Sequence, residues 1–235
     1  MKEHVKEIFN QLAAIYENSV DATSLYNSEY ERPAMMAELP RDLSGMNVFD
    51  AGCAAGWYTE QLADRCATVT AVDLSPEMVE AAKRRVGERA DVLCLDLENE
   101  LPFQAESFDL ILSSLTLHYL PDWNGAFAEF RRVLKPGGIL LFSVHHPFTD
   151  IRLLQTPAYF SIEPIIDRWN KEGKEFDVPF YRRPLSGILN TVLKQFTLEK
   201  VIEPQPTASF KERYREGFER LMAGPQFIII KATKN

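Results

Sequence analysis

The stretch VFDAGCAAGWYTEQLA, residues 48–63, decides how the rest of the chain is interpreted. Its apolar beginning predicts a buried strand, Gly52 and Gly56 mark a tight turn, and a helix follows. A strand, a tight turn and a helix N-terminus in this order bind nucleotide-like ligands, because backbone N–H groups face the ligand there. The stretch therefore predicts such a ligand at the end of this strand.

The turn departs from the dinucleotide-binding pattern. In that pattern a third glycine lets the helix pack tightly on the strand and the pyrophosphate approach, whereas Trp57 stands at this position here. Asp50, beside the turn, would repel a pyrophosphate and attract a cation. We therefore expect a nucleoside-like, partly cationic ligand without phosphates, and S-adenosylmethionine fits this description. The same two residues argue against an NAD-dependent oxidoreductase.

Strands and helices alternate on both sides of this stretch. Alternating apolar strands and amphipathic helices predict a parallel sheet covered on both faces. Helices are also predicted near both ends of the chain, and residues 147–183 show no clear periodicity. The predicted strands are 46–51, 67–73, 90–96, 107–115, 137–146, 197–204 and 226–233, and the predicted helices are 4–16, 33–39, 56–66, 75–86, 122–135 and 184–196.

Composition limits the class of protein. The 235 residues suit one α/β domain with an insertion, and the net charge of −8 disfavours a nucleic-acid partner. The sequence shows no apolar run near the roughly 20 residues that span a bilayer, so no membrane partner is expected. Three cysteines match no metal-ligand spacing, which predicts no metal site and a reduced, cytoplasmic location.

Two further carboxylates follow the second and third predicted strands. Asp73 is placed to accept hydrogen bonds from both ribose hydroxyls of a nucleoside. Asp96 is placed to accept the adenine amino hydrogen, while the Leu97 N–H meets a ring nitrogen. Leu74 and Met78 are expected to pack on the adenine face. Because the carboxyl ends of parallel strands share one sheet edge, these groups are expected to converge on one ligand.

Together, the glycine turn and the three carboxylates make the sequence resemble the class I, Rossmann-like S-adenosylmethionine-dependent methyltransferases. The stretch FDAGCAAG resembles their first motif, Asp-x-Gly-x-Gly-x-Gly, and AVDLSPEM resembles their ribose motif. CLDLENELPFQAESFDLILSSLTLHYL and RVLKPGGILLFS resemble the segments of the following strands. The remainder, including YNSEYERP, SVHHPF, FYRRPLS and EPQPT, is similar to an uncharacterised bacterial subgroup of small-molecule methyltransferases.

The resemblance implies a fold and a division of the chain. It implies an α/β fold with seven strands in the order 3-2-1-4-5-7-6, the last antiparallel, with helices on both faces. A lid insertion is expected after strand five. The expected parts of the single domain are an N-terminal helical cap (1–44), a cofactor-binding core (45–146), a lid or substrate insertion (147–183) and a C-terminal helix and strand pair (184–235).

The resemblance also adds cofactor contacts. It implies that Gly52, Ala54, Gly56 and Ser113 lie against S-adenosylmethionine, which leaves as S-adenosylhomocysteine. The family usually has glycine at the position of Ala54, so alanine is compatible only if its φ stays negative. We expect at most a small loss of affinity there. In many family members N-terminal helices fold over the cofactor, which makes Tyr16, Tyr26 and Arg32 candidates, the arginine for the cofactor carboxylate.

Histidines mark the expected methyl end of the site. His145 and His146 end strand five on an extended chain, so their side chains point to opposite sides. We expect His146 to face the pocket, because Pro147 fixes the chain after it, and to act as a base or bind the acceptor. His118 and Tyr119 follow strand four and are candidates for the acceptor pocket. Each of these residues also has a purely structural interpretation.

Aromatic and arginine side chains of the insertion complete the candidates. Trp169, Tyr181 and Arg183 would suit an acceptor with an apolar body and an acidic group. We therefore expect methyl transfer to a small molecule by a monomer or a homodimer, with the attacking atom undetermined. A catalytically silent protein that senses S-adenosylmethionine is the alternative.

Overall fold

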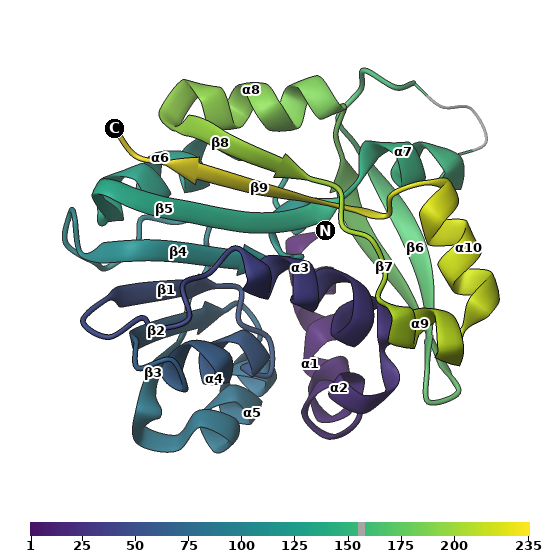
Figure 1. Ribbon diagram of the computed structural model, residues 1–235, viewed down its shortest axis with the longest axis horizontal. Coiled ribbons are helices and arrows are strands. Elements are labelled where there is room, and N and C mark those ends of the chain that lie inside the picture. Colours follow the sequence, from purple (N-terminus) through teal and green to yellow (C-terminus); the bar gives the residue numbers. More distant parts are fainter. Residues whose placement is uncertain (155–157) are drawn as a thin grey trace.

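A seven-stranded sheet forms the centre of the computed structural model, which describes residues 1–154 and 158–235 (Figure 1). The strand order is β3-β2-β1-β4-β5-β9-β8, in which β9 runs antiparallel to β5 and to β8. This confirms the expected seven-stranded order. The strands are β1 Asn47–Ala51, β2 Thr68–Asp73, β3 Ala90–Cys94, β4 Phe108–Ser114, β5 Leu134–His145, β8 Thr197–Ile202 and β9 Phe227–Thr233.

Helices cover both faces of the sheet, as a mostly parallel sheet requires. On one face, Phe127 and Phe130 of α6 and Val192 of α8 pack on apolar side chains of β1, β4, β5 and β9. On the other face, Met35 of α3 and Leu62 of α4 pack on the alternate residues of the same strands. The helices are α3 Arg32–Ala37, α4 Trp57–Ala63, α5 Pro76–Val86, α6 Asn124–Val133 and α8 Leu185–Gln195.

Local chemistry explains where these helices begin and end. The Ser75 side chain accepts the N–H of Met78, and Pro76 occupies the first turn of α5, so Ser75 is the N-cap that starts the predicted helix. At the other end Gly87 has φ +58° and ends the helix. Strand β2 therefore leads into α5 through a fixed turn, and this turn positions Asp73 at the sheet edge.

The insertion is more regular than its composition indicated. Its second half is an antiparallel hairpin of β6 Glu163–Lys171 and β7 Lys174–Arg182, in which Trp169 is opposite Phe176. Glu172 and Gly173 both have positive φ, which is typical of a two-residue hairpin turn. The expectation of an irregular segment was therefore wrong. The preceding short helices are α7 Pro147–Asp150 and η4 Ile151–Leu153, and residues 155–157 of the expected lid lie outside the described residues.

The N-terminal helices and the hairpin gather at the carboxyl ends of the parallel strands (Figure 1). Helix α1 contacts both α5 and β7, so the beginning of the chain and the insertion meet above one sheet edge. Two helices between β8 and β9 were not expected from the sequence. The elements are α1 Lys2–Asn18, α2 Val20–Thr23, the π-helical η1 Asn27–Glu31, α9 Ala208–Arg213 and α10 Arg215–Ala223.

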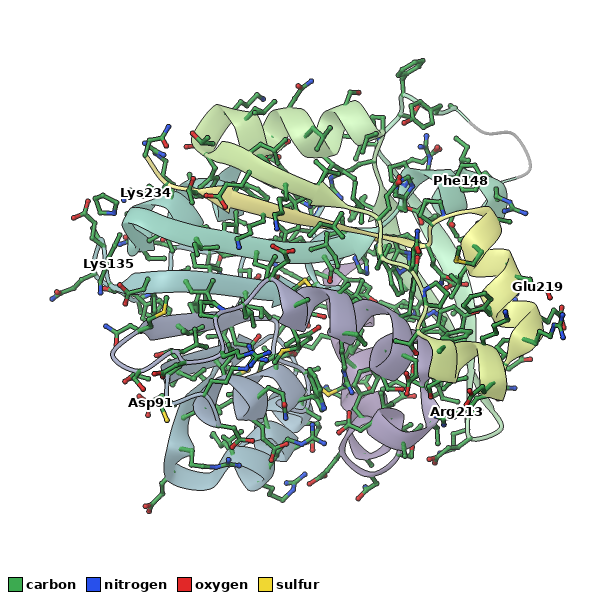
Figure 2. The ribbon with its side chains drawn as sticks, in the orientation of Figure 1. Asp91, Lys135, Phe148, Arg213, Glu219 and Lys234 are labelled. Carbon is green, nitrogen blue, oxygen red and sulfur yellow. The ribbon has the colours of Figure 1, made fainter. Side chains whose placement is uncertain are left out.

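Charged side chains such as Lys135, Arg213 and Glu219 lie at the periphery of the molecule in Figure 2. Among the described residues, no helix combines the length and apolar character that crossing a bilayer requires. The same residues include no cluster of three or more His, Cys, Asp or Glu side chains arranged to hold a metal ion.

Candidate active site

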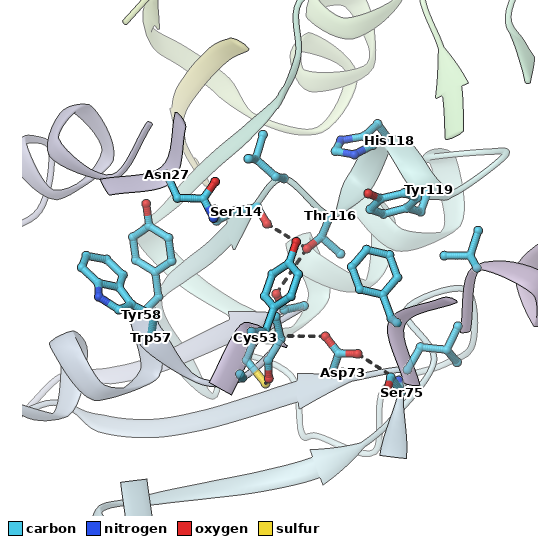
Figure 3. Close-up of a pocket in the computed structure, with 18 of the residues that line it drawn as sticks. Asn27, Cys53, Trp57, Tyr58, Asp73, Ser75, Ser114, Thr116, His118 and Tyr119 are labelled. Atoms are coloured by element: carbon cyan, nitrogen blue, oxygen red, sulfur yellow. Dashed lines mark hydrogen bonds between the residues drawn. The ribbon is translucent and has the colours of Figure 1, made fainter. Parts of the chain in front are cut away.

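A cavity of about 410 Å³ lies at this sheet edge, between the strand ends, the N-terminal helices and the hairpin (Figure 3). Residues from sequence positions far apart line it together. Thirteen of the residues predicted from the sequence are among them: Tyr16, Tyr26, Arg32, Gly52, Ala54, Asp73, Leu74, Asp96, Leu97, His118, Tyr119, His145 and Trp169.

The glycine turn forms part of the cavity wall. Gly52 has φ +93°, and a Cβ there would lie 2.2 Å from Oγ1 of Thr116, so only glycine fits. Gly56 has φ +82° and packs against Ala82 of α5, where a Cβ would approach within 3.0 Å. Ala54 also has positive φ, +46°, so the condition stated for an alanine at this position is not met. The backbone of Ala54 is strained, and its N–H is turned toward Asp73.

Asp73 is held in place by the backbone. Its Oδ2 accepts the N–H of Ala54 at 2.9 Å, and its Oδ1 accepts the N–H of Ser75 at 2.9 Å (Figure 3). Burial raises the pKa of Asp73, and these hydrogen bonds oppose that rise. The carboxylate lines the cavity with a fixed orientation, which is what recognition of a vicinal diol requires.

The third strand end carries a second carboxylate. Asp96 lines the cavity, and its Oδ2 accepts a hydrogen bond of 2.8 Å from Nζ of Lys2 on α1. Its Oδ1 accepts the backbone N–H of Glu98 at 2.9 Å. Helix α1 therefore begins directly above the position expected for adenine. Leu97 is buried beside Asp96, and Leu74 lines the wall between the two carboxylates.

Four predicted cofactor contacts lie behind the cavity wall instead of on it. Asp50 is 1% exposed, and its carboxylate accepts the Thr59 hydroxyl at 2.7 Å, because strand alternation turns it toward α4. Burial raises the pKa of Asp50 to about 7. The other three support the wall from behind, since Gly56 contacts α5, Met78 is buried in the core, and the Ser113 hydroxyl donates to the Ala51 carbonyl.

The two adjacent histidines point to opposite sides, but the assignment from the sequence was reversed. His146 is absent from the cavity lining: its Nδ1 accepts the N–H of Phe148, and its Nε2 lies 3.0 Å from Glu203. The reason is that His146 caps α7, and this turns its ring toward that helix. Burial lowers the pKa of His146, against the effect of Glu203. His145 lines the cavity instead.

His118 and Tyr119 bring further rings to the same region. The His118 ring lies 4.4 Å from the His145 ring, and Tyr119 lies 5.2 Å from Phe9, centroid to centroid. Within residues 1–154 and 158–235, neither nitrogen of the buried His118 ring has a hydrogen-bond partner. Burial lowers the pKa of His118 well below its ordinary value, so this imidazole is neutral. Trp169 of the hairpin packs against Phe9 and lines the cavity.

Two predicted acceptor contacts lie outside the main cavity. Arg183 donates to the carbonyls of Leu120 and Pro121, and its guanidinium lies 4.5 Å from the centre of the Trp123 ring. Burial lowers the pKa of Arg183 to about 10. Tyr181 and Arg183 face a separate small space behind His118 and His145, because β7 turns them away from the cofactor side. They are therefore not part of the main cavity wall.

The N-terminal candidates line the cavity but have partners of their own. Arg32 forms an ion pair of 2.8 Å with Asp21, and its guanidinium lies 4.1 Å from the centre of the Trp57 ring. Tyr26 accepts a hydrogen bond from Arg220. Burial raises the pKa of Tyr16 to about 12, so its hydroxyl stays protonated. The Trp57 ring therefore packs against the Arg32 guanidinium, and it occupies the position where the dinucleotide-binding pattern has its third glycine.

Residues 49–142 match the model of the methyltransferase domain family. This segment contains the glycine turn, Asp73 and Asp96, and it covers the sheet from β1 to β5. The chain carries the class I methyltransferase fold. S-adenosylmethionine is the cofactor of this class, and the groups that line the cavity fit it: Asp73 can accept from a diol, Asp96 can accept from an amino group, and Gly52 leaves room for close approach.

Known methyltransferases resemble the chain over much of its length. An S-adenosylmethionine-dependent methyltransferase from Mesorhizobium loti superposes with a TM-score of 0.70 at 26% identity, covering 87% of this chain and 97% of that one. The biotin biosynthesis bifunctional protein of Cellvibrio japonicus is 33% identical over 175 residues, which are 73% of this chain and 34% of that protein. The malonyl-[acyl-carrier protein] O-methyltransferase of Serratia marcescens is 32% identical over 174 residues, 74% of this chain and 60% of that protein.

The sequence analysis missed one prominent residue of this cavity. Glu31 is 1% exposed, yet it lines the cavity, and its carboxylate accepts hydrogen bonds from the hydroxyls of Tyr58, Ser114 and Ser143. Burial raises the pKa of Glu31, and these three hydroxyls oppose the rise. The stretch YNSEYERP contains Glu31, but its three partners are far away in the sequence, and only the fold brings them to this stretch.

Proposed function

We propose that the protein transfers the methyl group of S-adenosylmethionine to a small molecule that binds in the same cavity. The observation that carries this proposal is the fixed Asp73 carboxylate at the end of β2, which lines a cavity of about 410 Å³. Pockets that hold a cofactor-sized ligand have volumes of roughly 300–1,000 Å³. The cavity therefore has a volume in the range of a cofactor-sized ligand.

The chain's own residues have distinct roles in this proposal. Asp73 accepts the ribose hydroxyls, and Asp96 with the Leu97 N–H binds adenine after Lys2 releases the Asp96 carboxylate. Gly52 allows the cofactor to approach the backbone, and Arg32 lies near enough to the cavity to pair with a carboxylate. When bound, the cofactor supplies an already activated methyl group. The protein then has to hold an acceptor in line and exclude water.

The net charge of −8 supports a small-molecule acceptor over a nucleic acid, because phosphate backbones need a basic surface. The Serratia relative has a name that identifies a carrier-bound malonyl group as its acceptor. For the present chain the acceptor is proposed only as a small molecule. A cytoplasmic location and a monomeric or homodimeric state belong to the same proposal.

Calorimetry with S-adenosylhomocysteine tests the cofactor site without an acceptor. Asp73→Ala should weaken binding by roughly 2–4 kcal/mol, because two charge-assisted hydrogen bonds are lost. Asp91→Ala, an exposed carboxylate on β3, is the matched control and should leave the affinity unchanged. Binding of NAD that is as tight as that of S-adenosylhomocysteine would refute the proposal.

Turnover separates an enzyme from a binding protein. Incubation with S-adenosylmethionine and a library of small acceptors should yield S-adenosylhomocysteine in proportion to methylated product. Tight binding without turnover in any such mixture would instead favour the sensor alternative.

A further inference from the structure

Two imidazoles and a buried carboxylate meet beside the cavity. His118 comes from η3 Leu117–Tyr119, His145 ends β5, and Asp150 ends α7. The two rings lie 4.4 Å apart, and both line the cavity. Figure 3 shows His118 and Tyr119 on the side of the cavity that faces away from Asp73. This cluster therefore lies beyond the residues assigned to the nucleoside part of the cofactor.

Asp150 is in contact with the His145 ring. It is 2% exposed, and its Oδ1 lies 3.3 Å from Nδ1 of His145. In the described part of the chain this oxygen has no other hydrogen-bond partner, and the 3.3 Å to Nδ1 is its ion-pair contact. A carboxylate beside Nδ1 stabilises a proton on that nitrogen. It thereby leaves the lone pair of the neutral imidazole on Nε2.

The remaining neighbours of the His145 ring are two aromatic side chains and a few titratable groups. The rings of Phe180 and Phe227 pack on the imidazole from β7 and β9. The titratable groups are His118, Asp150 and, across the small space behind the ring, Tyr181 and Arg183. Arg183 is engaged by the carbonyls of Leu120 and Pro121. Asp150 is the carboxylate among these groups, so its oxygen is the acceptor available to an Nδ1–H of His145.

We infer that His145 is the general base for a hydroxylated acceptor, a phenol or an enol on an apolar body, and that Asp150 is its positioning residue. This inference rests on the proposed function. His145 Nε2 takes the hydroxyl proton, and the oxygen's electron pair forms the new bond to the methyl carbon. The carbon–sulfur bond breaks with its electrons on sulfur, and the imidazolium then releases the proton to solvent. The rings of Phe227, which packs on His145, and of Tyr119, which packs on His118, line the cavity on this side and provide apolar surface.

The tautomer of His145 can be measured without any acceptor. Long-range ¹H–¹⁵N spectra of the complex with S-adenosylhomocysteine should show the Nδ1–H form for His145. In Asp150→Ala the population should shift toward the Nε2–H form. Glu203→Gln is the matched control, because Glu203 is paired with His146 outside the cavity, and it should leave the His145 signals unchanged. An unchanged tautomer in Asp150→Ala would overturn the positioning role.

A series of phenols with graded acidity tests the base and the acceptor class. His145→Gln should slow methyl transfer to weakly acidic phenols by roughly 10²- to 10⁴-fold. The loss should shrink for nitrophenols, which are already ionised at the assay pH. Asp150→Asn should lower kcat by roughly tenfold or more, with little change in KM, because part of the population holds the wrong tautomer.

Each outcome of this series decides something. An equal loss for all phenols would overturn the role of His145 as a base, and transfer to none of them by the wild-type protein would overturn the acceptor class. Calorimetry separates these results from failure of the proposed function, because S-adenosylhomocysteine should bind the wild type, His145→Gln and Asp150→Asn with similar affinity. If the wild type does not bind it, the proposed function itself fails.

Discussion

The hydroxyl of Ser143 donates a hydrogen bond of 2.6 Å to Oε1 of Glu31, a residue 112 positions earlier in the chain. Ser114 donates to the same oxygen at 2.8 Å, and Tyr58 donates to Oε2 at 2.8 Å. The buried carboxylate thus joins the N-terminal helices to β4, β5 and α4. It therefore holds the N-terminal helices, which form one wall of the cavity, against the sheet.

Glu31→Ala should therefore destabilise the protein by about 3 kcal/mol, because three hydroxyls lose their acceptor in a buried place. Urea unfolding followed by circular dichroism measures this change. Glu29→Ala, on the same helical segment but partly exposed, is a comparison expected to cost less. Equal losses for the two variants would show that the Glu31 network contributes little to stability.

The buried Asp50 should make stability depend on pH. Its pKa is raised to about 7 in the folded protein, so the folded state binds more protons than the unfolded state between about pH 4 and 7. Stability contributed by the protonated carboxyl is present at low pH and is lost as the pH rises through 7. The difference amounts to at most roughly 4 kcal/mol.

Asp50→Asn keeps the shape of the side chain and removes the titration. Denaturant unfolding between pH 4.5 and 7.5 should give a smaller fall in stability with rising pH in this variant than in the wild type. Parallel curves for the two proteins would mean that Asp50 titrates at its ordinary value in the folded state.

Ala54→Gly should stabilise the protein by up to about 1 kcal/mol. At φ +46° the Cβ of alanine is sterically unfavourable, and glycine has no Cβ. The greater entropy of glycine in the unfolded chain acts in the opposite direction and limits the gain. A higher Tm with unchanged affinity for S-adenosylhomocysteine is the expected result. Ala55→Gly, at the next position, serves as a control and should lower the Tm.

The insertion is expected to respond to ligands. Trp169 lines the cavity from the hairpin, and Ser19 at the end of α1 donates to Glu172 in the hairpin turn at 2.7 Å. Hydrogen exchange in β6 and β7 should slow when S-adenosylhomocysteine and an acceptor are both bound. The same exchange rates in the free and bound protein would indicate a fixed wall and no lid.

Local sequence patterns were sufficient for most of the sheet and for the strand ends that carry Asp73 and Asp96. Strand periodicity and turn residues placed Asp73 and Asp96 at neighbouring strand ends, because parallel strands share one carboxyl edge. The order of the last two strands came from the family resemblance, since no local pattern fixes which strands pair.

Side-chain direction at the ends of strands was harder to predict. Alternation showed that His145 and His146 diverge, but only the cap on α7 and the pairing of His145 with Phe227 decide which of them faces the cavity. Asp50 faces α4, where the hydroxyl of Thr59, nine positions later, donates a hydrogen bond to its carboxylate. Contacts between distant segments settle such cases, and the network of Glu31 is another example.

The family match ends at residue 142, whereas the N-terminal helices and the hairpin, which form much of the cavity wall, lie outside the matched segment. Phe9 and Tyr16 come from α1, and Trp169 comes from the hairpin, while Asp73 and Asp96 come from the sheet. The wall that these segments supply can therefore vary without disturbing the strand ends that carry Asp73 and Asp96. We therefore expect that grafting residues 163–182 from a relative would change the wall that Trp169 supplies while leaving Asp73 and Asp96 in place.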